Sequence, residues 1–192
     1  MLAGLVVLAL AAPDAPVWVL RGAAGYSVQD VAVRYHGQAY TVGSNGPLLT
    51  VSLLREVRGS NVAARFGGVL EHRLGTSYSG VDYGFDAGEP HSVVNVFTPS
   101  IAGQARWVPG RFFLGLEGRF GLLLLRGTAG SGTSAATFAA TRGVGMLRLD
   151  TGVWVGAERV WEIALSVGLA VAVTSPGDAT LADAMLGVGH AF

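Results

Sequence analysis

Residues 161–174 read WEIALSVGLAVAVT, and two kinds of side chain alternate along the whole stretch. Every second residue from Trp161 onward is large and apolar, and the residues between are small or polar. This period of two predicts a β-strand, because a helix would scatter both sets around its circumference. A strand with one apolar face and one small, polar face suits a transmembrane β-barrel, which has lipid outside and a crowded lumen inside.

The composition supports a barrel over a bundle of membrane helices. Hydrophobic residues make up 51% of the 192 residues and charged residues only 14%, against about 25% charged in a soluble domain. The 29 glycines disfavour long helices. After the first residues, no uninterrupted apolar run is long enough for a membrane helix, which needs about 18 residues or more. The hydrophobicity is therefore spread as alternation.

Cysteine count and charge exclude several classes of function. The chain has no cysteine, so it forms neither a disulfide framework nor a thiolate metal site. No spacing typical of metal ligands occurs, and we expect no metal and no cofactor. Thirteen basic and 13 acidic residues give a formal charge of zero, which argues against a nucleic-acid partner.

The first residues resemble a secretory signal. Residues 1–12, MLAGLVVLALAA, are apolar, and small residues continue to Ala15. We interpret residues 1–15 as a signal segment, although no positive charge precedes the apolar run; a buried first strand or short helix is the alternative. Residues 16–25 are either a leader or the start of the first strand, and residues 26–192 form the barrel.

The alternation predicts an all-β fold with eight antiparallel strands in an up-and-down meander. We expect the first strand within residues 26–42, ended by the turn signal Gly-Ser-Asn-Gly-Pro at 43–47. Pro99 interrupts one strand and residues 122–125, four leucines, break the alternation of another, so we expect a bulge at each. The other strands are expected at 48–57, 62–74, 91–107, 112–125, 147–156, 161–174 and 181–192.

The connections alternate in length. Short turns are expected at 58–61, 108–110 and 158–160, and longer loops at 75–90 and 127–142. Short periplasmic turns, long extracellular loops and an even number of strands are the rule for bacterial outer-membrane barrels.

The end of the chain carries a resemblance to a known family. Phe192 is the last residue, and apolar Ala184, Leu186 and Val188 precede it at alternating positions. This pattern resembles the small eight-stranded outer-membrane barrels of Gram-negative bacteria, the OmpA/OmpX-like group, although His190 stands where that group commonly has Tyr. The resemblance implies a place in the outer-membrane lipid and an assembly signal, Leu186, Val188 and Phe192, read by the barrel-assembly machinery.

The charged residues on the inner face are the main candidate site. A barrel of eight strands is only wide enough for its own side chains, so charges inside it must be paired. We interpret them as a network of ion pairs that closes the lumen; a narrow pore or small-molecule conduit is the alternative. The principal members are Arg65, Glu71, Arg73, Arg106, Glu117, Arg119, Arg148 and Asp150, and the alternation adds Glu158, Glu162 and Asp183.

Large aromatic residues recur near the short-turn ends of the strands. Outer-membrane barrels carry such girdles at both membrane interfaces. We therefore expect an interfacial girdle there, made of Trp107, Phe112, Phe113, Trp161 and Phe192.

From the sequence we expect either a structural role or a role in interactions made by the loops. Tyr78, Tyr83 and Phe85 in the first long loop could contact an extracellular partner, or could pack over the barrel mouth. Some small outer-membrane barrels modify lipid A, and His72, His91 and Ser92 are possible parts of a hydrolytic site with the loop acids Asp82, Asp86 and Glu89. Nothing in the sequence fixes their geometry, so we expect no enzymatic activity and assign no catalytic residue.

Overall fold

The chain folds into one closed antiparallel barrel. The computed structural model describes residues 17–35, 38–77, 92–129, 136–156, 158–172 and 179–192. Each strand pairs with its neighbours in chain order and β1 pairs with β8, so the sheet has no free edge. The prediction of an eight-stranded up-and-down barrel is confirmed. The strands are β1 (Val17–Tyr35), β2 (Gln38–Arg58), β3 (Val62–Ser77), β4 (Ser92–Trp107), β5 (Phe112–Ala129), β6 (Ala136–Val155), β7 (Trp161–Ala172) and β8 (Ala179–Ala191).

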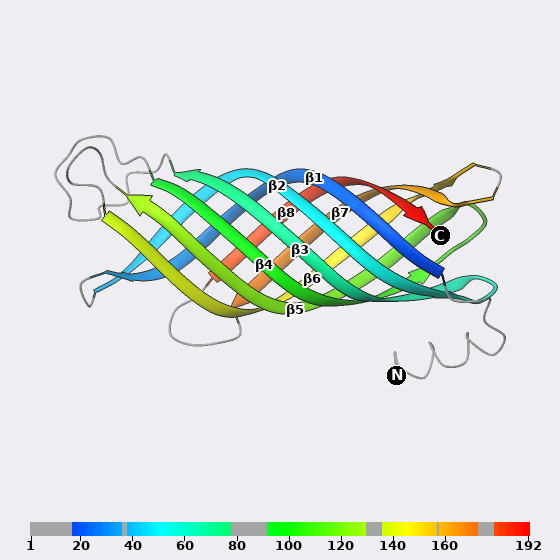
Figure 1. Ribbon diagram of the computed structural model, residues 1–192, viewed down its shortest axis with the longest axis horizontal. Helices are drawn as coiled ribbons and strands as arrows, with labels where there is room; N and C mark the ends of the chain where they lie inside the picture. The colour runs from blue at the N-terminus through cyan, green and yellow to red at the C-terminus, as the bar shows by residue number, and fades with distance from the viewer. Residues whose placement is uncertain (1–16, 36–37, 78–91, 130–135, 157, 173–178) are drawn as a thin grey trace.

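The two ends of the barrel differ. Figure 1 shows β1, in blue, beginning and β8, in red, ending at the same end, and the three short connections at 59–61, 108–111 and 156–160 lie there as well. We call this the short-turn end and the opposite one the distal end. Gly110 and Gly156 have φ of 69° and 86° in two of these turns, a conformation that glycine adopts without steric cost. By the rule for outer-membrane barrels, the short-turn end faces the periplasm.

The outer face is an apolar belt. Most large apolar residues point outward and most charged ones inward, as the alternation predicted. Ile101 on β4 is 71% exposed and Leu169 on β7 is 64% exposed, which in water would be a large unfavourable surface. Such a belt is stable only in lipid. Further members are Leu49, Val51, Leu53, Phe66, Leu70, Leu114, Phe120, Leu147, Leu149, Leu165, Leu186 and Val188. No helix in the part of the chain described above is long and apolar enough to cross a bilayer.

The first strand begins within residues 16–25, one of the two alternatives left open, whereas the expected turn at 43–47 was wrong. β1 begins at Val17, and residues 43–47 are not a turn but part of β2, where Gly43 pairs with Asp30 and Pro47 with Tyr26. The pairing of β2 with β3 lacks residues 46 and 47 yet keeps its register on both sides. The long ladder with β1 therefore outweighs the local turn signal.

Neither expected bulge is present. The register between β4 and β5 is the same before and after Pro99, and only the pairs of Thr98 and Pro99 are missing from that ladder, as expected for a residue that has no N–H to donate. Residues 122–125 alternate regularly: Leu123 and Leu125 are buried inside while Leu122 and Leu124 face outward. The four leucines mark a place where both faces are apolar.

The long loops are shorter than expected. β5 and β6 pair through Leu125 with Ala140 to Ala129 with Ala136, so most of the expected loop 127–142 is a strand hairpin. The side chains there are small, but backbone pairing does not require large ones. β3 likewise continues to Ser77. The expected signal segment 1–15, residues 78–91 of the first expected long loop and residues 173–174 of the opening stretch lie outside the described residues.

Candidate functional site: the barrel lumen

The lumen is filled by charged and apolar side chains that lie in groups along the barrel axis. At the distal end an apolar layer lies beyond two groups of ion pairs, whereas at the short-turn end apolar and charged side chains are interleaved: Glu162 pairs in register with Trp154, and Arg58 lies over the Trp154 ring. Residues from all eight strands contribute, because each strand points every second residue inward.

The first group of ion pairs, which we call the short-turn cluster, has Asp150 and Glu162 at its centre. Asp150 on β6 accepts hydrogen bonds from Arg21 Nη1 and Nη2 at 3.1 and 2.9 Å. Glu162 on β7 is held by both terminal nitrogens of Arg65, at 3.0 and 2.7 Å, and by Arg106 at 2.8 Å. Two-pronged pairs of this kind fix geometry as well as charge. The full set is Arg21, Glu56, Arg58, Arg65, Arg106, Asp150 and Glu162.

Aromatic rings balance the extra positive charge of this cluster. It contains four arginines and three carboxylates. Arg58 lies over the Trp154 ring at 4.1 Å from its centroid, and Arg106 lies over Phe113 at 4.0 Å. The negative face of an aromatic ring attracts a guanidinium, more strongly where water is excluded. The ring of Trp154 thus partly compensates the guanidinium in excess.

The second group, the central cluster, is balanced by carboxylates alone. Arg148 Nη2 donates to Asp183 Oδ2 at 2.8 Å and to Glu71 Oε2 at 3.2 Å. Arg73 donates to the same two carboxylates, with 2.7 Å to Asp183. Three arginines face three carboxylates, and all are buried. The members are Glu71, Arg73, Glu117, Arg119, Arg148 and Asp183.

Inward-facing glycines make room for these long side chains. A Cβ at Gly168 would lie 2.9 Å from Arg148 Nε and 3.0 Å from Asp183 Oδ1, and one at Gly187 would lie 2.8 Å from Arg21 Nε. Such distances are below van der Waals contact. Small residues on the inner face therefore leave the space that the long charged side chains occupy.

Buried apolar side chains form two further groups, which we call the short-turn layer and the distal layer. The short-turn layer comprises Val19, Phe113, Trp154, Ala164 and Ala191. The distal layer comes from β4 to β8 and comprises Val94, Val96, Leu123, Leu125, Val144, Met146, Ala170, Ala179 and Leu181. On the β1–β2 side of the distal end the lining is polar, with Gln29 Nε2 donating to Ser44 Oγ at 2.8 Å. The central cluster is buried, whereas Arg58 of the short-turn cluster remains partly exposed.

A few buried polar atoms have no hydrogen bond to the described protein. In the central cluster these are Arg73 Nη1, Arg148 Nε and Asp183 Oδ1. Buried polar groups are almost always satisfied, so each is expected to hold an ordered water molecule.

The structure brings together the charges singled out from the sequence. Arg65, Arg106 and Asp150 are in the short-turn cluster; the other principal members and Asp183 are in the central cluster, and Glu162 joins the first. Glu158 is a correction, because it lies exposed in the turn before β7. Sequence reasoning missed Arg21, in the stretch 16–25 whose assignment was left open, and Glu56, within the expected strand 48–57. With β1 beginning at Val17, simple alternation would have included Arg21.

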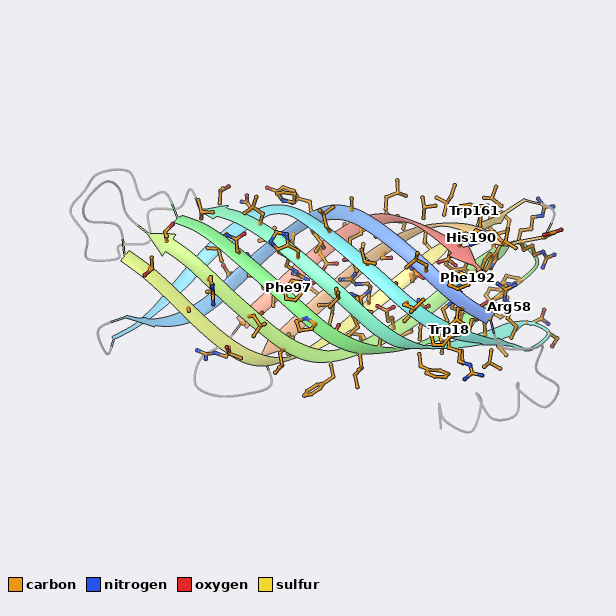
Figure 2. The ribbon with its side chains drawn as sticks, in the orientation of Figure 1. Trp18, Arg58, Phe97, Trp161, His190 and Phe192 are labelled. Carbon is orange, nitrogen blue, oxygen red and sulfur yellow. The ribbon has the colours of Figure 1, made fainter. Side chains whose placement is uncertain are left out.

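The aromatic residues divide between the two faces. Figure 2 shows Trp18, Trp161, His190 and Phe192 gathered at the short-turn end, with Phe97 set away from them. Four of the five expected girdle residues are exposed: Trp107, Phe112, Trp161 and Phe192. Phe113 is a correction: it is 2% exposed and packs edge-on against Trp154 inside the lumen, because its neighbour Phe112 takes the outward position. Trp18 was not expected there.

The possible hydrolytic residues do not converge in the described part of the chain. His72 is exposed on the outer face of β3, whereas Asp82, Asp86, Glu89 and His91, like the aromatic residues Tyr78, Tyr83 and Phe85, fall outside the described residues. Among the residues described, no group of three or more His, Cys, Asp or Glu is placed to hold a metal ion.

Comparison with known proteins identifies the fold. The sequence matches no protein-family model and no curated protein. Among solved structures, Neisserial surface protein A, NspA, aligns with a TM-score of 0.56 and 10% identity, over 93% of this chain and all of that one. Ail of Yersinia pestis aligns at TM-score 0.46 and 12% identity over 91% and 98% of the two chains. The N-terminal barrel of Pseudomonas aeruginosa OprF aligns at 0.44 and 15% over 91% and 97%.

The likeness to NspA confirms, at the level of the fold, the resemblance to small eight-stranded outer-membrane barrels. Such low identity says nothing about activity. Together with the apolar outer face, this fold makes the chain an integral β-barrel of the bacterial outer membrane.

Proposed function

We propose that this outer-membrane barrel is a non-conducting anchor that carries its distal hairpins and loops outside the cell for interaction. The observation that supports a closed lumen is that side chains fill it. Two groups of paired, buried charges fill the lumen, and apolar side chains that include Leu123 and Leu125 line the β4–β8 side of its distal end. A conducting path needs continuous water, whereas here a permeating ion would have to break buried ion pairs.

The lengths of the strands support the display of hairpins. β2 contains 21 residues and β6 contains 20. At about 3.3 Å per residue and a tilt of about 40°, either strand spans roughly 50 Å along the axis, about twice the apolar belt of about 25 Å. The excess lies at the distal end. There, Arg126, Thr128, Thr137 and Thr141 on β5 and β6 are exposed, which fits a hairpin in water.

The test is single-channel recording in planar bilayers. The refolded wild-type protein should be electrically silent. A variant with Leu123→Ala, Leu125→Ala and Arg119→Ala, which thins both the distal layer and the central cluster, should show frequent openings and so prove that the protein is inserted. Steady conductance by the wild type would overturn the closed lumen and favour the narrow pore.

The interaction role has a separate test. Replacing the residues of the β5–β6 hairpin beyond Thr128 and before Thr137 by a short Gly-Ser turn should leave the barrel folded and silent, but reduce binding of the bacteria to host extracellular material or serum proteins. Equal binding by the shortened variant would move the role away from this hairpin. The proposal assigns no catalytic role; release of fatty acid from lipid A by the purified protein, seen by mass spectrometry, would contradict that.

A further inference from the structure

A polar patch interrupts the apolar exterior at the distal edge of the apolar belt. Register brings its members together: Asn95 on β4 pairs with Arg126 on β5, and Thr128 pairs with Thr137 on β6. His72 on β3 pairs with Phe97 of β4, which lies two residues from Asn95 toward the short-turn end. We call this group the rim patch; its members are His72, Asn95, Arg126, Thr128, Thr137 and Thr141, and all are exposed.

The rim patch lines a continuous groove on the outer surface. One part, of about 480 Å³, runs between Val93, Asn95, Arg126 and Thr128. The other, of about 390 Å³, runs between His72, Phe97, Leu124 and Thr141. Both parts share Asn95, Arg126 and Ala139. Both parts of the groove combine polar and apolar side chains: Val93 lines the distal part beside Arg126, and Phe97 and Leu124 line the part toward the middle of the belt.

The height of the patch matches the lipid headgroups of the outer leaflet. On β4 the outward residues run from Trp107, at the short-turn interface, up to Phe97, which is about ten residues away. At about 3.3 Å per residue and a tilt of about 40°, that distance is about 25 Å along the axis, the usual thickness of the apolar belt. Asn95 and Arg126 come next and so lie just above the hydrocarbon.

The charge of the groove is positive. Arg126 makes no ion pair with any residue that the structure describes, whereas every arginine of the two lumen clusters makes at least one. The exposed acid of the described distal exterior, Asp30, is on β1. Because β1 and β5 are four strands apart in a closed barrel of eight, Asp30 lies on the opposite side. Among the residues that the structure describes, an anion near the groove therefore meets a guanidinium without an ion pair and no competing carboxylate; Asp82, Asp86 and Glu89 lie outside the described residues.

We propose that the rim patch binds the phosphorylated headgroup of an outer-leaflet lipid. Arg126 pairs with the phosphate, since a guanidinium matches its oxygens with two parallel donors. The Asn95 amide and the Thr128 and Thr137 hydroxyls serve the remaining phosphate or sugar oxygens. An acyl chain of the same lipid then packs along Phe97 and Leu124, toward the middle of the apolar belt. An amphipathic ligand fits because polar side chains and large apolar ones line the same groove. The site does not depend on whether the lumen conducts.

The experiment is native mass spectrometry of the full-length protein released from detergent micelles. The probes are bisphosphorylated lipid A, the same lipid after removal of both phosphates, and phosphatidylcholine. Arg126→Gln is compared with Arg55→Gln. Arg55 is also an exposed, outward-facing arginine, but it lies on β2 near the short-turn end, beside Trp18 and Phe66. Heat-dependent gel mobility checks that both variants remain folded.

The wild type should bind bisphosphorylated lipid A in preference to both other lipids. Arg126→Gln should weaken that binding about tenfold, the size expected for loss of a hydrogen bond to a charged group, and Arg55→Gln should leave it unchanged. Equal binding of the dephosphorylated lipid would overturn the proposal. So would equal loss in both variants, which would mean diffuse charge attraction, or a wild type that binds none of the lipids and leaves the patch for a protein partner.

Discussion

Arg21 and Asp150 form a two-pronged ion pair across the lumen that joins β1 to β6. Arg21 Nη1 and Nη2 lie 3.1 and 2.9 Å from the two carboxylate oxygens, and the residues are 129 positions apart in the chain. Asp150 also accepts hydrogen bonds from Gln104 at 2.9 Å and Ser166 at 2.7 Å, and it pairs with Arg106. One carboxylate thus connects four strands and fixes the cross-section of the barrel.

Replacing Asp150 should therefore be costly. Asp150→Asn keeps the shape but leaves Arg21 and Arg106 without their shared counter-charge, and removing one partner of a buried pair costs about 3 kcal/mol or more. We expect a loss of that size in the free energy of unfolding, measured by urea titration in phospholipid vesicles. The control is Arg55→Gln, which removes an exposed charge and should change the value by less than about 0.5 kcal/mol. Similar values for the two variants would mean that the lumen network adds no stability.

The central cluster should set the ion selectivity of any leak. On a background of Leu123→Ala and Leu125→Ala, which opens the distal layer, Glu71→Ala leaves an extra positive charge beside Arg73, Arg119 and Arg148. Arg148→Ala on the same background leaves an extra negative one. We expect anion-selective openings in the first case and cation-selective openings in the second, from reversal potentials in a salt gradient. The same selectivity in both would show that ions bypass this cluster.

Glycines on the two faces should respond differently to substitution. Gly168 faces Arg148 and Asp183, so Gly168→Leu must displace a buried ion pair, whereas a Cβ at Gly118, on the outer face, meets nothing within 4 Å. Overpacking alone costs about 1–3 kcal/mol. We expect Gly168→Leu to lower the urea midpoint strongly or prevent folding, and Gly118→Leu, whose side chain enters lipid, to be neutral. Equal tolerance at both sites would contradict a filled lumen.

Alternation alone was enough for the fold and for most of the lumen charges. Arg65, Glu71 and Arg148 could be assigned inward because the residues beside them are large and apolar, and lipid and lumen impose opposite preferences. The method failed where that contrast disappears. At Leu123 and Leu125 both faces are apolar, because the distal lumen is itself apolar on this side, and hydropathy cannot distinguish it from lipid.

Local turn signals misled in a different way. Gly43 to Pro47 has the composition of a turn, yet its backbone pairs with β1 over a long ladder. The composition of a segment shows which local structures it can adopt. Whether it forms a strand also depends on the residues with which it pairs elsewhere in the chain. Arg21 was missed because the start of the first strand was left open, whereas Glu56 lies within the expected strand 48–57 and its parity with Thr50 and Ser52 could have placed it inward. The inward position of Phe113 could have been predicted from the sequence. Its neighbours Phe112 and Leu114 were placed on the outer face, and successive side chains of a strand point to opposite faces.

Phe192 allows the assembly signal to be separated from stability. Its backbone N–H and C=O pair with those of Trp18 at 2.9 and 3.0 Å, closing the seam between β1 and β8, and these bonds do not need the ring. The ring is 64% exposed and contacts His190, with centroids 6.3 Å apart. Phe192→Ala should therefore refold in detergent with a nearly unchanged melting temperature. In cells it should yield several-fold less folded, heat-modifiable protein in the outer membrane, if the assembly machinery reads the terminal aromatic.

The matched control is Phe112→Ala, because Phe112 is 65% exposed in the same girdle at the start of β5. Loss of an interfacial ring is common to both variants, so lipid anchoring should affect them equally, and only recognition of the chain end should separate them. Equal yields in cells would contradict a role for Phe192 in assembly. A fall in the melting temperature of Phe192→Ala alone would instead assign the ring to the seam, where its stacking on His190 would hold β8 against β1.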